Sequence, residues 1–408
     1  MLFQFREKHS FTKECLVALL LLYNSFSWYF IGQLIVTKLA KAISTDSSAS
    51  LYLQAAFPIS IIISALIGSV IWSKICGSKN LHVWLILGTV ISIFPATSIA
   101  NSFVSGIIII VALGTSLGLG MPSLLSYFSK SIPIENRGKV AGVTFFMITA
   151  SVPLLIMGTS AFDLATFAIL FAVWRSWSIP ILLAFPLNRT TQLEREREPP
   201  FLNVFQNRPF VLYFLAWFMF SMIDGFESHV LFTHKQEFGL TMNIAEPIIA
   251  AFTALIAGIF ADWIGRKKII ISGFVLLGVA HAVLGIASQF WISWIIFFVI
   301  NGISIGLLWT MFTIVLWGEL ARASEKYYAI GETPFFLTQV LSLLFAPYVA
   351  LIPEISAFSL AAFFLFIAVI PLLYAPETLP EKRIQERQLK IYTEEALKLK
   401  QKVEQKQT

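Results

Sequence analysis

Long apolar runs separated by short polar segments make up most of this chain. Each run holds roughly 20 residues, the length that a helix needs to cross about 30 Å of hydrocarbon. The runs are continuously apolar rather than alternating, which argues against the strands of a β-barrel. We therefore predict an all-α polytopic membrane protein. Its twelve expected transmembrane helices lie at residues 14–38, 51–73, 81–101, 103–128, 139–161, 164–187, 209–230, 243–263, 268–288, 290–318, 327–352 and 355–375.

The composition agrees with this class. Hydrophobic residues make up 57% of the chain, whereas soluble domains hold about 45 to 50%. The first apolar run continues through "SFSWYFIGQLIV" without a small-residue cleavage site, so we expect a retained helix rather than a signal peptide. The two cysteines form no metal-binding motif, and neither a metal nor a cofactor is predicted.

The basic residues are distributed unevenly between the two sides of the predicted membrane. Of the 29 Lys and Arg residues, 25 fall in loops or tails on the side of the N-terminus, and Lys38, Lys41 and Lys235 fall on the other side. The remaining one, Arg175, lies inside a predicted helix. Positive residues favour the cytoplasmic side, so we expect a protein of the cell membrane with both termini in the cytoplasm. The net charge of +6 then reflects topology, and no nucleic-acid partner is predicted.

The twelve runs divide into two sets of six. The polar stretch "LNRTTQLEREREPP" separates them, and landmarks recur about one half-chain apart: "LLAFP" and "LLYAP" end 190 residues apart, at Pro186 and Pro376. Such repetition indicates a duplicated unit. We therefore predict an N-terminal six-helix bundle, a cytoplasmic linker, a C-terminal six-helix bundle and a charged cytoplasmic tail, at residues 1–187, 188–208, 209–375 and 376–408.

The stretch "FADWIGRKK" concentrates charge between two apolar runs. Its Gly258, Asp262, Gly265, Arg266 and Lys267 fit the pattern G-x-x-x-D-x-x-G-R-[KR]. This resembles the loop signature of the major facilitator superfamily, which occurs after the second helix and, often weakened, after the eighth. In the first half the corresponding loop reads "VIWSKICGSKN", with a lysine in place of the aspartate. Here the second copy is therefore the better preserved one.

Other stretches are similar to sugar-porter-like members of the superfamily. In "WGELARASEKYYAIG", Glu319 precedes Lys326 by seven residues, where those members have glutamate and arginine. The stretch "SYFSKSIPIENRGKVAG" keeps the arginine, Arg137, but has lysine in place of the glutamate, and "PETLP" is similar to the sugar-porter ending. The resemblance implies two pseudo-symmetric six-helix bundles and secondary transport by alternating access. We expect a monomer.

The charged loops are predicted to hold the cytoplasmic ends of the bundles together. Asp262 would accept hydrogen bonds from the free amides of a helix that starts near Gly138 and Lys139, where the helix dipole favours an anion. Arg266 would pair with Glu319, and Arg137 is a further gating candidate by the resemblance. The alternative is that "GRKK" only anchors the loop on the cytoplasmic side.

Charged residues inside predicted helices are the other candidates for function, because each is costly near the bilayer centre. Asp224, Glu227 and the neighbouring His229 lie toward the outer end of the helix at 209–230 and are candidates for proton coupling. If that helix ended early, they would instead be exterior loop charges. Glu332 is a further candidate, at a kink predicted from Gly331 and Pro334, and a structural pairing is equally open.

Polar and aromatic residues of two further helices are candidates for lining a substrate cavity. Asn24 and Trp28 are four apart and share one helix face, and Gln33 follows on the same helix. Arg175 would offer a cation near the midplane. The alternatives are polar groups that join helices and an arginine stacked on neighbouring tryptophans.

We predict a secondary active transporter, not an enzyme. Its partners would be a small-molecule solute, protons and the lipid bilayer, with symport of a sugar or other metabolite favoured. Alternatives are an efflux antiporter for drugs or metabolites, and a non-transporting membrane sensor or enzyme on the same fold. The sequence contains neither a His/Glu metal motif at helical spacing nor a phosphate-binding loop, which disfavours an enzyme or ATP-driven transport.

Overall fold

The computed structural model describes residues 13–44, 46–72, 79–97, 102–185, 200–320, 324–349 and 351–380. Every regular element in this part of the chain is helical. The first half contains α1 (Lys13–Ile43), α2 (Ser47–Ile67), α4 (Asn80–Ile91), α5 (Phe103–Ser131), α6 (Arg137–Ala161), α7 (Leu164–Ser176) and α8 (Ser178–Ala184). The second half contains α10 (Phe201–Gln206), α11 (Arg208–Ile264), α12 (Arg266–Ala287), α13 (Trp291–Trp309), α14 (Trp317–Leu320), α15 (Glu325–Gly331), α16 (Thr333–Val349) and α17 (Glu354–Tyr374).

Eleven helices among the described residues are long and apolar enough to cross a membrane. The run expected at 81–101 gives a shorter apolar helix, Asn80–Ala96, whose α-helical part ends at Ile91 and whose last turn contains Pro95. Proline removes a backbone donor and does not continue an α-helix easily, which accounts for the shorter element. Together these helices match the twelve predicted passes.

α11 contains two of the expected helices in one continuous element. Its candidate spans are Arg208–Glu227 and Ile244–Ile264. Asn207, at its start, hydrogen-bonds to Leu320 and Tyr327, and Arg266, just after its end, contacts Glu319. Both ends of α11 therefore lie at the same end of the molecule, so the element must double back. We call this end the basic end.

Several helices are interrupted within a single pass. α13 continues through the π-helical segment Thr310–Leu316 into α14, all within the span Trp291–Leu320. The kink predicted from Gly331 and Pro334 is present, because α15 ends at Gly331 and α16 begins at Thr333. Such interruptions leave backbone groups that neighbouring residues must satisfy.

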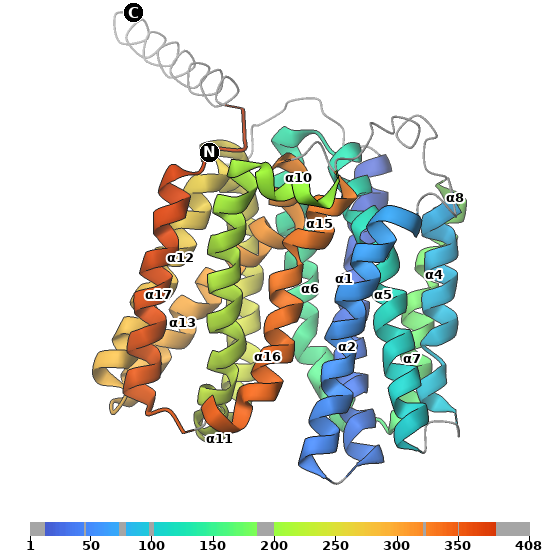
Figure 1. The fold of residues 1–408 in the computed structure, drawn as a ribbon, viewed down its shortest axis with the longest axis horizontal. Helices are drawn as coiled ribbons and strands as arrows, with labels where there is room; N and C mark the ends of the chain where they lie inside the picture. Colours follow the sequence, from blue (N-terminus) through green and yellow to red (C-terminus); the bar gives the residue numbers. More distant parts are fainter. Residues whose placement is uncertain are drawn as a thin grey trace, which may run out of the picture.

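The two sets of helices stand side by side (Figure 1), with the basic end at the top of the view, near α10 and α15. Across the boundary between the sets, α6 packs against α11 and α2 packs against α16. Large apolar side chains such as Leu154, Leu183 and Ile286 are exposed on the outside. Helices that are apolar both inside and outside are typical of a membrane protein. The division at 1–187, 188–208 and 209–375 stays a prediction, and residues 186–199 of the expected linker and 381–408 of the expected tail lie outside the described residues.

Close packing of α2 against α5 depends on two glycines four residues apart. A Cβ atom at Gly114 would lie 2.6 Å from the carbonyl oxygen of Phe57, and one at Gly118 would lie 2.4 Å from that of Ile61. Real Cβ atoms do not approach backbone oxygens so closely. Small residues at this spacing allow helix backbones to touch in a membrane.

We expect Gly114→Ala to lower the unfolding temperature in detergent, because the added methyl group forces α2 and α5 apart at a cost of about 1–3 kcal/mol. Gly158→Ala is the matched control, since its Cβ would meet only Phe167, at 3.5 Å. Both changes bring the same gain in helix propensity. Equal unfolding temperatures for the two variants would contradict the packing argument.

Candidate functional site

Asp262 joins the two halves of the molecule at the basic end. Its Oδ1 accepts a hydrogen bond from the backbone amide of Gly138 at 2.9 Å, and its Oδ2 accepts one from that of Lys139 at 2.8 Å. α6 begins at Arg137, so these amides have no partner within their own helix. The Asp262 side chain is fully buried. The contact predicted from the sequence is therefore present.

The glycines of the same region let the two backbones meet. A Cβ at Gly258 would lie 2.2 Å from the carbonyl oxygen of Gly138, and one at Gly142 would lie 2.5 Å from that of Ala254. α11 and α6 therefore touch backbone to backbone, one helical turn before Asp262. This close approach is what brings the carboxylate within reach of the start of α6.

Arg266 extends the connection between the halves. Its guanidinium lies 2.9 Å from Oδ1 of Asp262 and 3.1 Å from Oε1 of Glu319, and all three side chains are buried. It also donates to the carbonyl oxygens of Ala261, at 2.7 Å, and of Ile134 in the first half, at 2.5 Å. The predicted Arg266–Glu319 pair is present. A buried guanidinium needs such a full set of acceptors, because an unpaired buried charge is costly.

Gly265 separates α11 from α12 with a φ of +107°, in the region that favours glycine. A Cβ at this position would also lie 2.3 Å from Oε2 of Glu377. Glu377 accepts hydrogen bonds from the amides of Arg266, at 2.8 Å, and Lys267, at 3.1 Å, and so caps the start of α12. Lys267 itself donates to the carbonyl oxygen of Leu373, within the second half. Sequence reasoning did not single out Glu377, although the "PETLP" stretch contains it.

Arg137 does not pair with a carboxylate through any contact recorded among the described residues. Its Nε donates to the carbonyl oxygen of Ile132 at 3.0 Å, and its Nη2 donates to that of Ser129. Ser129 in turn is hydrogen-bonded through its hydroxyl to Tyr328 of the second half, whose hydroxyl donates to the carbonyl oxygen of Ile314 at 2.9 Å. Arg137 therefore supports a second link between the halves through backbone contacts.

A polar cavity lies between the halves, farther from the basic end. It has a volume of about 260 Å³ and includes Asp224, which is 16 residues beyond the start of α11, or about 24 Å along the helix. The helix continues past Asp224 and Glu227, so these residues are not part of an exterior loop. The polar lining comes from both halves, with Gln33, Thr37 and Gln54 on one side and Ser221, Asp224, Thr338, Gln339 and Ser342 on the other.

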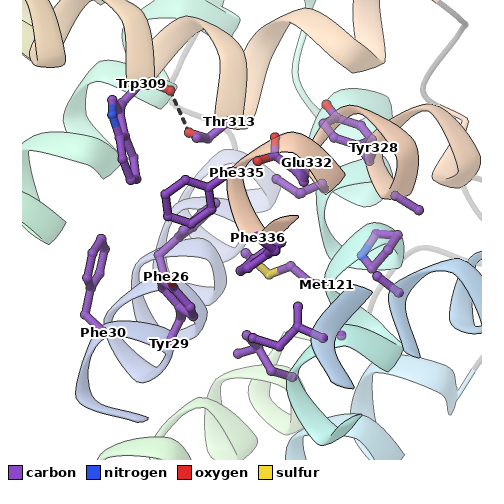
Figure 2. A pocket seen from close by; sticks show the side chains of 17 residues that line it. Phe26, Tyr29, Phe30, Met121, Trp309, Thr313, Tyr328, Glu332, Phe335 and Phe336 are labelled. Carbon is purple, nitrogen blue, oxygen red and sulfur yellow. Dashed lines mark hydrogen bonds between the residues drawn. The ribbon is translucent and has the colours of Figure 1, made fainter. Parts of the chain in front are cut away.

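A smaller apolar pocket of about 50 Å³ lies closer to the basic end (Figure 2). Aromatic side chains of α1, α13 and α16 surround it, with Glu332 at its edge. Tyr29 contacts the rings of Phe335 and Phe336 and accepts a hydrogen bond from Gln339 at 2.6 Å. Because Gln339 lines the polar cavity, Tyr29 and these two rings form the layer between the two spaces. We call it the aromatic layer.

Glu332 is hydrogen-bonded to a residue of the second half. Its Oε1 accepts a hydrogen bond from the indole of Trp317 at 3.0 Å. It therefore lies at the apolar pocket, close to the interruption between α15 and α16. The structure places it away from the polar cavity that contains Asp224.

Asn24, Trp28 and Arg175 lie inside the first bundle, and neither of the two cavities described includes them. The Arg175 guanidinium donates to Asn24, at 2.8 Å, and Ser25, at 3.0 Å, and stacks between the rings of Trp28 and Trp84, each at 4.3 Å. Arg175 therefore stacks on tryptophan rings, as the alternative interpretation expected. The rings belong to Trp28 and Trp84, however, and not to the tryptophans next to Arg175 in the sequence. Asn24 and Trp28 do share one face of α1, but this face points into the bundle.

Gln33, expected together with them to line a cavity, does line the polar cavity. Glu227 contacts His281 of α12, with 2.9 Å between Oε2 and Nε2. Sequence reasoning missed His281, because it lies in an apolar run 54 residues away from its partner. The side chain of His229, the histidine expected to act with Asp224, lies outside the described part of the chain.

The comparisons with known proteins agree with this architecture. The family model of the Major Facilitator Superfamily matches residues 242–404. The fold is similar to that of the human organic anion transporter MFSD10 (TETRAN), with a TM-score of 0.67, 12% identity, and coverage of 88% of this chain and 99% of that chain. It is also similar to the proton:xylose symporter XylE bound to 6-bromo-6-deoxy-D-glucose, with a TM-score of 0.68, 16% identity, and coverage of 90% and 96%. A search of curated proteins finds no match.

Two bundles that meet at one end and enclose a polar cavity between them are the arrangement in which secondary transporters place their substrate sites. Residues 242–404 are similar to the Major Facilitator Superfamily, and the chain as a whole has the fold of the two solved transporters.

Whether the contacts of Asp262 hold the basic ends together can be tested by measuring their separation. Spin labels would be placed at two exposed lysines, Lys130 on the first bundle and Lys268 on the second, after Cys15 and Cys76 are replaced by serine. Asp262→Ala removes two hydrogen bonds to a charged acceptor, each contributing about 1.5–3 kcal/mol. We expect the longer label distances to gain population by roughly tenfold or more.

Lys139→Ala is the matched control, because it removes an exposed positive charge from the same site but keeps the amide that Asp262 binds. If the loop only anchors the chain, both variants should leave the distance distribution unchanged. That result would contradict the gating role.

Proposed function

We propose that this protein is a secondary transporter of the major facilitator type that couples the uptake of a small, hydroxyl-rich solute, such as a sugar, to protons. The observation that carries the proposal is the polar cavity, which presents three glutamines, four hydroxyl side chains and Asp224. Amides and hydroxyls both donate and accept hydrogen bonds, as recognition of a hydroxyl-rich molecule requires. A volume of about 260 Å³ lies just below the range of about 300–1,000 Å³ typical of drug-sized ligands, which favours a small solute.

The charge of the cavity also supports this solute class. Among the described residues that line it there is no Lys or Arg, whereas Asp224 contributes a carboxylate. An anionic solute would find no cation there to replace its water. The two solved structures are similar to this chain in fold alone, and their functions differ, one being an organic anion transporter and the other a proton:xylose symporter. The cavity favours a function of the second kind.

The position of the cavity supports uptake. It lies far from the basic end, which the contacts of Asp262 and Arg266 keep closed, and the aromatic layer separates it from the apolar pocket. With 25 of the 29 basic residues on one side, the basic end would face the cytoplasm of a cell membrane. The cavity would then receive solute from outside, and separation of the basic ends would release it inside.

Asp224 is the carboxylate we assign to proton coupling. A charged group at this depth is costly unless it is paired or hydrated. Protonation removes the charge, so that solute and proton together make the cavity neutral before the bundles move. Once Asp224 has lost its proton, its charge is tolerated only where water reaches the cavity. The ionised form would therefore favour the cavity that is open to the outside.

The solute class can be tested by thermal unfolding of the purified protein. A ligand that binds only the folded state stabilises it by mass action. We expect neutral sugars or polyols to raise the unfolding temperature, and organic anions of similar size to leave it unchanged. Stabilisation by anions alone would contradict the assignment of the cavity.

Coupling can be tested with Asp224→Asn in proteoliposomes. We expect a proton gradient to drive accumulation of the solute by the wild type but not by the variant, because asparagine cannot take up the proton. Solute counterflow without a gradient should continue, since the amide keeps the shape and hydrogen bonds of the cavity. Accumulation by both proteins would exclude Asp224 from coupling.

Asp163→Asn is the control for loss of a carboxylate away from the basic end. Asp163 is exposed and caps the start of α7, and the hydrogen bonds from Thr166 lower the pKa of its carboxyl group. Asparagine also caps helices well. We expect this variant to accumulate solute as the wild type does. Absence of flux by the wild type across sugars, organic acids and drugs would contradict the proposed function itself.

A further inference from the structure

Glu227 and His281 form a buried pair within the second bundle. Oε2 of Glu227 on α11 lies 2.9 Å from Nε2 of His281 on α12. The other ring nitrogen, Nδ1, lies 2.9 Å from the carbonyl oxygen of Leu277. The His281 side chain is fully buried, and that of Glu227 is only 9% exposed. Both groups are therefore removed from water apart from the small exposed part of the carboxyl group.

The contact with Leu277 fixes where the protons of the ring must be. A carbonyl oxygen can only accept a hydrogen bond, so Nδ1 has to carry a proton. In a neutral ring Nε2 would then have none, and its lone pair would face a carboxylate. Two acceptors at 2.9 Å in a buried site repel each other. The pair therefore holds one more proton, either on Nε2 of a charged ring or on the carboxyl group of Glu227.

The surroundings give this proton few other partners. α13 and α17 present the rings of Phe297 and Phe358 to His281. In the described part of the chain, the charged groups that act on it are both on α11, namely Glu227 and, through a longer-range interaction, Asp224. Acidic neighbours in an apolar setting favour the proton-loaded form of the pair.

Asp224 gives the pair a route to water. It lies three residues before Glu227, so the two carboxyl groups are neighbours on one side of α11, and it lines the polar cavity whereas Glu227 does not. The geometry points to a proton site formed by Glu227 and His281 that exchanges its proton with the solute cavity through Asp224. This inference rests on the proposed proton coupling and names a second group that takes part in it.

The transfer requires no other reactant. The proton leaves Nε2 of His281 for the carboxylate of Glu227, which leaves a neutral ring and a carboxylic acid. That acid then gives the proton to the Asp224 carboxylate or to water in the cavity. Loading runs through the same steps in reverse. Transfers among His281, Glu227 and Asp224 leave the total charge of these groups unchanged. That charge changes only when one of them takes up a proton from water in the cavity or releases one to it.

The proton can be observed directly by nitrogen NMR of ¹⁵N-histidine in the full-length protein in nanodiscs, together with infrared spectroscopy. His281→Asn identifies the signal of His281 among the five histidines. We expect either a doubly protonated ring, or a neutral ring with its proton on Nδ1 accompanied by a protonated carboxyl band that Glu227→Gln removes. A neutral ring with its proton on Nε2 beside an ionised Glu227 would overturn the inference.

Transport measurements test whether the pair takes part in coupling. In Glu227→Gln the amide can donate to Nε2, so the contact and the fold are kept while the extra proton is lost. We expect loss of the proton-driven part of solute accumulation with counterflow retained, and a normal response in Asp163→Asn. Proton-driven accumulation equal to that of the wild type would remove the pair from the mechanism.

The two proposals can fail separately. If Asp224→Asn abolishes coupling but Glu227→Gln does not, this inference fails and the proposed function stands. If the wild type shows no proton-driven accumulation but the spectra show the shared proton, the proposed function fails together with the role of the pair in coupling. If the pair is purely structural, His281→Asn should unfold at a lower temperature than the wild type. Transport by Glu227→Gln should then keep the pH dependence of the wild type.

Discussion

The basic end depends on two backbone amides that have no partner in their own helix. At the start of α6, the amides of Gly138 and Lys139 face the second bundle, and a donor removed from water there needs an acceptor. Asp262 satisfies both, and it can do so only because Gly138 and Gly258 let the backbones touch. The carboxylate also holds Arg266, so separating the bundles would expose the amides, the carboxylate and the guanidinium together. Closure of this end is therefore a cooperative state.

Farther from the basic end, the described contacts between the bundles are of another kind. Tyr29 meets Phe335 and Phe336 through ring contacts and Gln339 through one hydrogen bond. Apolar contacts have little directionality and can be exchanged for others at small cost. The structure thus combines specific, directional contacts where the bundles are closed with adaptable contacts beside the cavity. Such an arrangement suits a transporter whose bundles pivot around a bound solute.

The sequence predicted most of the fold and the closed end, and less of the interior. The Asp262 and Arg266 contacts were predictable because the motif fixes both the spacing of the charges and the helix starts that they meet. The spacing of Asn24 and Trp28 indicated a shared face of α1 but not whether that face points to the cavity or into the bundle. His281 was missed because its partner is 54 residues away. Contacts between neighbouring transmembrane helices leave no local pattern when a single polar residue on each helix makes them.

Buried charges in this protein differ in which bundle holds their partners, and this difference decides what each can do. Arg175 has Asn24, Ser25 and two tryptophan rings around it, all within the first bundle. Its surroundings do not change when one bundle moves as a unit against the other, so it can contribute to stability but not to switching. Asp224 lies on the cavity surface between the bundles, where its access to water would change if the bundles moved against each other. The free energy of an ionised carboxylate depends strongly on that access. The position of a charge relative to the moving boundary, rather than its depth in the membrane, therefore determines whether it can couple proton binding to transport.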